Sequence, residues 1–300
     1  MSLSSFKMNV SDVRTFSQKS TRGNNDSTNK VRERVLLHLY TLPQSYPDYL
    51  DHPDYGPEWR SLYQSWHDAI KTMAIKTGVP EYTSVDFVLK AGLRNHYDLD
   101  VFYGTLSGPL CRKMEFKYGT TQISKLPQIL SLFASYPLFD ETYDTFWYDR
   151  YLDRYIACDP GITVIKPVRD LYLKQVTNFQ HKNKPFFEQL RVREPHFKAE
   201  KKKVVDDSIA DFLDTYGAKA NLALLADKLS ASQDKNYLLC EKGVFHLERV
   251  ANEILPLTYL GIKNKNTIQV MRGTTLYNLL LRWRNRKGIL VPAWQISVKP

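Results

Sequence analysis

The residues of this sequence that could do chemistry gather in one stretch of alternating polar and apolar positions. Asp98 and Asp100 lie two positions apart, and Glu115 and Lys117 repeat that spacing further along the chain. In a β-strand, residues two apart point to the same face. If the two segments pair as an antiparallel hairpin, the aspartates and the Glu–Lys pair therefore lie side by side.

Such a grouping suits the hydrolysis of a phosphodiester bond. Two carboxylates on adjacent strands form the hard oxygen site that Mg²⁺ prefers, and Mn²⁺, which also takes oxygen ligands, can substitute for it. A lysine two residues beyond the glutamate can polarise a metal-bound water or stabilise charge that develops on a phosphate.

Two predicted strands position these side chains. The segment 97–103 alternates polar and apolar residues over its first half, and 112–118 alternates again. The stretch 104–109 between them is a predicted turn. This pattern is typical of a hairpin. Amphipathic helices are predicted before and after the hairpin from apolar residues at helical spacing, over residues 28–39, 57–77 and 124–133.

Asp100 followed by Glu115-Phe116-Lys117 resembles the motif of the PD-(D/E)xK nuclease superfamily. In that family an Asp at the start of a strand is followed by a turn and by Glu-x-Lys on the next strand. The resemblance implies an α/β fold with a restriction-endonuclease-like core, a mixed sheet flanked by helices, over residues 29–180. It further implies a Mg²⁺-dependent endonuclease that cuts DNA. Asp100 and Glu115 would then hold metal, with Asp98 as a further ligand, and Lys117 would activate water.

The motif departs from the family in one place, because Leu99 stands where the family has Pro. That departure leaves the choice between Asp98 and Asp100 open. In the family the metal-binding Asp opens an apolar run, as Asp100 does here, so Asp100 is the predicted catalytic residue. The alternative for the whole motif is a surface hairpin whose charges are solvated. The phrases 94–100 and 281–285 are also similar to nuclease-like proteins of large DNA viruses.

Three further residues are weaker candidates. Glu33, on the first predicted helix, would be an additional metal ligand, as upstream acids are in some superfamily members. Gln128, on the helix expected after Lys117, could touch substrate or metal. His96 precedes the first strand and could bind metal. Each also has a structural explanation, since exposed acids, polar helix residues and single histidines are common in ordinary domains.

The charge of the chain favours a polyanionic partner. Lys and Arg number 42 against 32 Asp and Glu, which gives a net charge of +10. After Glu253 there is no acidic residue. Arg282, Arg284 and Arg286 alternate there with other residues, followed by Lys287, so in a strand they form a ridge suited to backbone phosphates. The alternative is a solvated edge strand whose charges prevent aggregation.

Composition and motifs bound the remaining possibilities. With 43% hydrophobic residues the chain can build a core, which excludes a wholly disordered protein. The sequence has no phosphate-binding P-loop, serine-hydrolase or dinucleotide motif. We expect a disordered tail over 1–28, the nuclease core over 29–180 and a basic linker over 181–203. A β-rich α+β region that binds nucleic acid is expected over 204–300.

The expected partner is nucleic acid, DNA rather than RNA, with no membrane association. Cutting both strands would need two active sites and hence a homodimer, although the sequence carries no dimer signature. Three widely spaced cysteines favour a reducing, intracellular location, in the cytoplasm or nucleus. Two other functions stay open. One is a non-catalytic nucleic-acid-binding protein, and the other is a protein-interaction module that uses its Tyr and Trp residues as contact surfaces.

Overall fold

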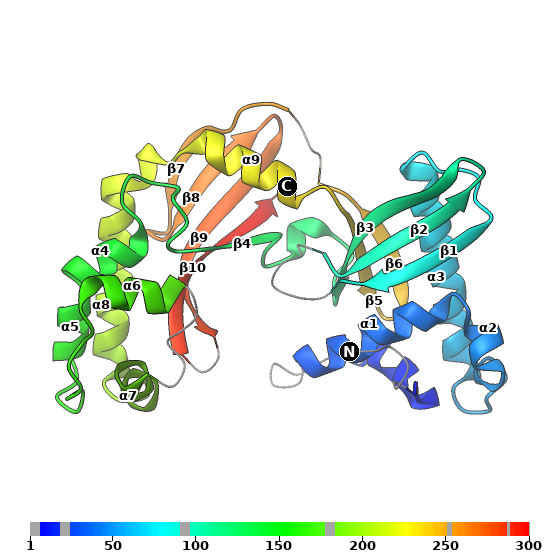
Figure 1. Ribbon diagram of the computed structural model, residues 1–300, viewed down its shortest axis with the longest axis horizontal. Helices are drawn as coiled ribbons and strands as arrows, with labels where there is room; N and C mark the ends of the chain where they lie inside the picture. Colours follow the sequence, from blue (N-terminus) through cyan, green and yellow to red (C-terminus); the bar gives the residue numbers. More distant parts are fainter. Residues whose placement is uncertain are drawn as a thin grey trace. The chain divides into compact units, whose positions relative to one another are not determined.

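The computed structural model describes residues 7–18, 25–90, 97–177, 184–250, 254–286 and 289–299 (Figure 1). The chain folds into two compact units. Unit 1 is formed by Met1–Leu126 and Ala231–Asn252, and unit 2 by Pro127–Ser230 and Glu253–Pro300. Each unit therefore combines an earlier and a later segment of the chain.

Helices open unit 1. They are η2 (Val10–Phe16), α1 (Asn25–Leu39), α2 (Leu42–Ser45), η3 (Pro47–Tyr49) and α3 (Gly56–Lys76). The sequence of α3 explains its bounds, because Pro57 lies in the first turn, where a missing N–H costs no hydrogen bond. Trp59, Leu62 and Trp66 follow at helical spacing and are buried. The helix ends before Gly78, whose φ of 76° is free of strain only for glycine.

A mixed five-stranded sheet completes unit 1. In spatial order its strands are β1 (Ser84–Leu89), β2 (Leu99–Thr105), β3 (Gly108–Tyr118), β5 (Asn236–Glu241) and β6 (Val244–Glu248). All neighbours are antiparallel except β3 and β5, which are parallel. The hairpin expected from the sequence is therefore confirmed as β2 and β3. Two strands from the later segment extend the sheet beyond it (Figure 1).

The core of unit 1 fixes which way the hairpin residues point. Met114 and Phe116 of β3 belong to the buried cluster that also contains side chains of α1 and α3. Glu115 and Lys117 alternate with them along the strand, so their side chains leave the other face of the sheet. On β2, the hydroxyl of Tyr103 donates to the carbonyl oxygen of Ile70 at 2.9 Å, which ties the strand to α3.

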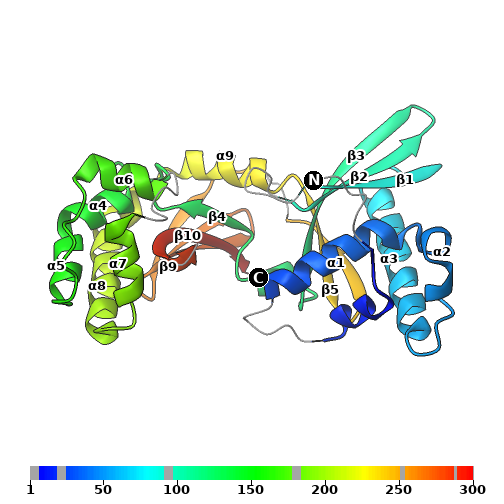
Figure 2. The ribbon, with the colours of Figure 1, turned by 60° about the horizontal axis from the view of Figure 1, so that its bottom comes forward.

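Unit 2 contains an antiparallel five-stranded sheet and most of the remaining helices. In spatial order the strands are β4 (Leu130–Phe133), β10 (Ile289–Lys299), β9 (Thr275–Arg286), β8 (Thr267–Arg272) and β7 (Thr258–Lys263). The helices are α4 (Tyr143–Arg150), α5 (Leu152–Ala157), α6 (Arg169–Thr177), α7 (Pro185–Arg193), α8 (Lys198–Tyr216), η5 (Gly217–Lys219) and α9 (Leu222–Ser232). Helices α4 to α8 gather beside the sheet (Figure 2). Of the helices in the described ranges, none is long and apolar enough to cross a membrane.

The α/β class is confirmed, but two expected boundaries are wrong. Within the expected tail 1–28, residues 10–16 form η2 and α1 starts at Asn25. Met8, Val13 and Phe16 are buried in the core of unit 1, and the indole N–H of Trp59 donates to the carbonyl oxygen of Val10 at 2.8 Å. The polar composition of this segment did not indicate that it is ordered, because only a few of its residues pack into the core.

The expected linker 181–203 is the second wrong boundary. Residues 185–193 form α7 and α8 begins at Lys198, both inside unit 2. Phe186 and Phe187 are buried, and the ammonium of Lys201 lies 2.7 Å from a carboxylate oxygen of Asp159. The basic residues are therefore part of a packed unit, and the expected division into 29–180 and 204–300 does not match the two units.

The helix expected over 124–133 is also wrong. The structure has a short 3-10 helix, η4 (Ile123–Lys125), followed by β4, which pairs with β10. Leu130 and Leu132 are buried and alternate with Ser131, which is the period of a strand. An apolar run this short is compatible with either a helix or a strand, and the pairing with β10 makes it a strand.

Candidate active site

Asp98 directly precedes β2 and lies opposite the Glu-x-Lys segment of β3. In the hairpin register Leu99 pairs with Met114, so Asp98 comes level with Glu115. The backbone N–H of Asp98 donates to the carbonyl oxygen of Met114 at 3.0 Å. Its Oδ2 accepts the backbone N–H of Phe116 at 2.9 Å. These two bonds fix the Asp98 carboxylate against β3.

Glu115 lies between two lysine side chains. The Nζ of Lys117 is 2.5 Å from Glu115 Oε1, and the Nζ of Lys235 forms an ion pair with Glu115 Oε2. The Glu115 side chain is 12% exposed and that of Lys235 is 3% exposed. Sequence reasoning missed Lys235, which precedes β5 and belongs to no motif. The parallel pairing of Met114 with Asn236 brings it beside Glu115.

Glu33, on α1, belongs to the same charged group. Burial is the main reason that the pKa of Glu33 is raised from 4.5 to about 7. The negative charge of Asp98 adds to this increase, and the positive charge of Lys117 opposes it. The expected accessory acid is thus close enough for its charge to interact with two residues of the hairpin. We call Glu33, Asp98, Glu115, Lys117 and Lys235 the charged cluster.

Burial shapes the protonation of the rest of the charged cluster. It raises the pKa of Asp98, an effect that the Lys117 ammonium opposes and the Glu115 carboxylate reinforces. Burial alone would lower the pKa of Lys117, but Glu115 and Asp98 more than offset it, so this pKa is raised. Burial lowers the pKa of Lys235, although Glu115 resists the change. Lys117 is therefore a firmly charged cation among acids.

Asp100 has different neighbours. It pairs across the hairpin with Lys113, which lies on the same face as Glu115 but two residues away along β3. Its Oδ2 lies 3.2 Å from the Nζ of Lys90, and its side chain is 8% exposed. Burial raises the pKa of the Cys111 thiol, and the negative charge of Asp100 raises it further. The structure thus brings Asp98 together with Glu115 and Lys117, and places Asp100, the aspartate preferred from the sequence, in a separate ion pair.

The donor chemistry of the charged cluster fits Mg²⁺, although its arrangement is that of an ion-pair network. Asp98, Glu115 and Glu33 offer carboxylate oxygens, the ligands that Mg²⁺ takes. Both oxygens of Glu115 contact ammonium groups, which supply the positive charge that a metal would supply. Within the described part of the chain, no three His, Cys, Asp or Glu side chains form a group that could hold a metal. His96 lies outside the described residues.

Gln128 belongs to unit 2. Its Oε1 accepts a hydrogen bond from the Nε2 of Gln295 at 2.6 Å. Gln128 lies just before the strand β4, so it does not lie on the expected helix. In this unit the side-chain amides of the two glutamines join the segment just before β4 to β10.

The expected basic ridge is visible in part. Arg282 and Arg284 alternate with Trp283 on β9, as the sequence predicted. Arg282 is exposed, whereas Arg284 is half-buried and its Nη1 donates to the hydroxyl of Ser131 at 2.9 Å. Burial, together with the charge of Arg282, lowers the pKa of Arg284. The Arg286 side chain and Lys287 lie outside the described residues.

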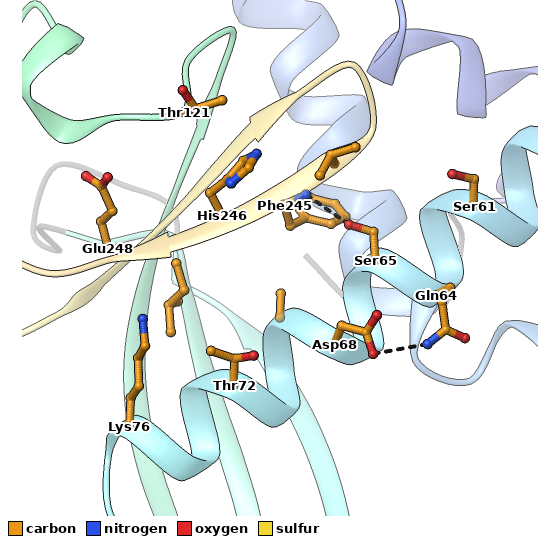
Figure 3. A pocket seen from close by; sticks show the side chains of 13 residues that line it. Ser61, Gln64, Ser65, Asp68, Thr72, Lys76, Thr121, Phe245, His246 and Glu248 are labelled. Carbon is orange, nitrogen blue, oxygen red and sulfur yellow. Dashed lines mark hydrogen bonds between the residues drawn. The ribbon is translucent and has the colours of Figure 1, made fainter.

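Unit 1 also has an open hollow of about 690 Å³ between α3 and β6, which the sequence did not suggest (Figure 3). Several of its polar groups bond to one another or to the backbone. Gln64 donates to Asp68 at 3.0 Å, Ser65 accepts the N–H of Phe245 at 2.9 Å, and Glu248 accepts the N–H of Ile123 at 2.7 Å. With a single histidine, His246, the hollow offers weaker chemistry than the charged cluster.

Comparison of the chain with protein-family models, with curated proteins and with solved structures finds no match. A functional assignment therefore rests on the residues and their geometry.

Proposed function

We propose that this protein is a Mg²⁺-dependent nuclease that hydrolyses phosphodiester bonds of DNA. The observation that carries the proposal is the grouping of Asp98, Glu115 and Lys117 across the β2–β3 hairpin. These residue types in this pattern resemble the PD-(D/E)xK motif, with Asp98 in place of Asp100 as the aspartate. Glu33 adds a fourth charged side chain from α1.

Each side chain has a proposed role. Asp98 and Glu115 would hold Mg²⁺, with water completing its coordination, and Glu33 would add negative charge nearby. When bound, the metal supplies Lewis-acid stabilisation of the phosphate and a more acidic water. Lys117, whose raised pKa keeps it charged, would stabilise negative charge on the phosphate. Lys235 would balance the charge of Glu115 while no substrate is present.

The order of elements in unit 1 supports the same proposal. A helix, α3, is followed by β1, β2 and β3, and the sheet is mixed, as a restriction-endonuclease-like core requires. One departure is that no α-helix of the same unit follows β3, only the short 3-10 helix η4. The chain instead enters unit 2 and returns to unit 1 as β5, which lies parallel to β3.

The ion pairs of Glu115 favour a second candidate, a nucleic-acid-binding protein without catalysis. Lys117 and Lys235 together neutralise Glu115, so the charged cluster could serve only to join β3 and the start of β5. The net charge of +10 and the exposed Arg282 would then account for binding to a polyanion.

Incubation of the full chain with supercoiled plasmid separates these candidates. The nuclease should convert plasmid to nicked circles with Mg²⁺ or Mn²⁺ and leave it intact with EDTA. Glu115→Gln, purified in the same way, controls for a contaminating nuclease and should be inactive. A parallel incubation with RNA tests the preference for DNA, and direct linearisation would point to a homodimer. If the wild-type chain retards plasmid migration but never cuts, the non-catalytic candidate is right.

A further inference from the structure

A hollow of about 300 Å³ in unit 2 combines aromatic walls with basic residues at its mouth. Its apolar lining comes from α5, α8 and β9, and consists of Tyr155, Val205, Ile209, Leu281 and Trp283. Lys198, Lys202 and Arg282 stand around it. The volume lies at the lower end of small-ligand sites, at roughly 300–1,000 Å³, so it suits one nucleotide and excludes a duplex.

The aromatic walls are held in place by the core of unit 2. The indole N–H of Trp283 donates to the hydroxyl of Tyr143 at 3.2 Å. Trp283 also meets the ring of Trp147 edge to face, with 4.6 Å between ring centroids, and Tyr155 meets the same ring at 5.6 Å. Both Trp283 and Tyr155 are half-buried, so each keeps some surface for contact with a ligand. Rigid aromatic surfaces of this kind bind flat rings at low entropic cost.

The charges around the hollow favour an anion. Lys201 forms a buried ion pair with Asp159, and Lys202 is paired with Asp206. Lys198 and Arg282 are exposed, and the described residues include no ion-pair partner for either. The lining contains one further acid, Glu194. The balance at the mouth is therefore positive.

Asn266 adds a polar group that can read a ring edge. Its Oδ1 accepts the hydroxyl of Thr267 at 2.9 Å, and its amide N–H groups are the donors that it can offer a ligand. Aromatic walls, a side-chain amide and adjacent cations are the features with which proteins bind an unpaired base and its phosphate.

We propose that this hollow binds a single unpaired nucleotide, with the base between Tyr155 and Trp283 and the phosphate at Lys198 and Arg282. This inference rests on the nucleic-acid binding in the proposed function, but it is independent of cleavage. It gives unit 2 a defined task, which is to hold one extruded or terminal base of the strand.

Calorimetric titration of the full chain in EDTA tests the proposal with dAMP, dTMP, deoxyribose 5-phosphate and inorganic phosphate as probes. Stacking of a base contributes about 1–3 kcal/mol, so the nucleotides should bind at least about fivefold more tightly than the two probes without a base. Val205→Trp places a large side chain in the hollow and should weaken nucleotide binding by at least about tenfold. Ala199→Trp adds the same side chain at an exposed position of α8 and should leave binding unchanged.

Three results would overturn the proposal. The first is no binding of either nucleotide up to millimolar concentration, and the second is equal binding of dAMP and deoxyribose 5-phosphate. The third is unchanged nucleotide binding in Val205→Trp, with its circular dichroism spectrum confirming the fold. The plasmid assay is scored separately, so loss of nucleotide binding and lack of cleavage remain distinguishable.

Discussion

Lys235 forms a buried ion pair with Glu115, although the whole earlier segment of unit 2 separates them along the chain. The parallel pairing of β3 with β5 brings them together. Burial lowers the pKa of Lys235, which means that its ammonium is held in an unfavourable environment by the neighbouring carboxylate. An ammonium in this place competes with any metal that Glu115 binds.

Removal of the Lys235 charge should therefore strengthen metal binding. Two unit charges 4 Å apart interact by about 4 kcal/mol at an effective dielectric constant of about 20. We expect Lys235→Met to bind Mg²⁺ at least about tenfold more tightly than the wild type in calorimetric titration. Lys113→Met, which removes an exposed lysine from β3, the strand that carries Glu115, is the matched control. Unchanged Mg²⁺ affinity in a folded Lys235→Met variant would argue against Glu115 as a metal ligand.

Glu33 should make stability depend on pH around neutrality. Its folded-state pKa of about 7 lies above the reference value of 4.5, so the folded protein binds this proton more tightly than the unfolded chain does. The resulting stabilisation is complete below 4.5 and is lost as pH rises through about 7. Burial raises the pKa of Asp98 as well, which acts in the same direction.

Glu33→Gln isolates this contribution, because glutamine has nearly the same shape and does not titrate. Without metal, the melting temperature of the wild type relative to Glu33→Gln should fall as pH is raised from about 5 to about 8. Mg²⁺ should reduce the difference at the upper end if the metal binds near enough to Glu33 to stabilise its charge. Parallel melting curves at all pH values would show that Glu33 titrates normally.

The sequence predicted the hairpin but could not predict what completes it. Alternation along 97–103 and 112–118 is a local signal, so β2, β3 and the common face of Glu115 and Lys117 followed from it. The contact between Lys235 and Glu115 could not be predicted, because the sequence of neither strand indicates that β3 and β5 pair. The preference for Asp100 over Asp98 rested on a face argument, whereas the structure places Asp98 level with Glu115. Register decides which residue lies level with Glu115, and a face argument cannot distinguish two residues on one face.

Lys117 should matter for cleavage and not for binding. Lys117→Met keeps the length of the side chain but removes the charge that would stabilise the reacting phosphate. Loss of one such group costs about 10²–10³-fold in rate. We therefore expect plasmid cleavage to fall by that factor, while DNA affinity measured in EDTA changes little. A variant that cuts at the wild-type rate would remove Lys117 from the site.

The basic ridge should contribute unequally to DNA binding. Arg282 is exposed, whereas Arg284 is half-buried and bonded to Ser131, so Arg282 is freer to contact a phosphate. Replacing Arg282 by Gln should reduce the slope of log affinity against log salt by about 0.9 in magnitude. Replacing Arg284 by Gln should change the slope less. Equal slopes for the wild type and Arg282→Gln would place the bound DNA elsewhere.

The pair Asp98→Asn and Asp100→Asn gives the most direct test of the proposed site, with plasmid nicking measured over a range of Mg²⁺ concentrations. Both substitutions preserve side-chain size and remove one carboxylate charge, and both residues belong to the same strand region. Asp98 contacts the Glu-x-Lys segment, whereas Asp100 is paired with Lys90. Asp98→Asn should therefore abolish nicking at every Mg²⁺ concentration, and Asp100→Asn should retain it in protein that remains folded. Loss of nicking in Asp100→Asn with wild-type activity in Asp98→Asn would contradict the site described above.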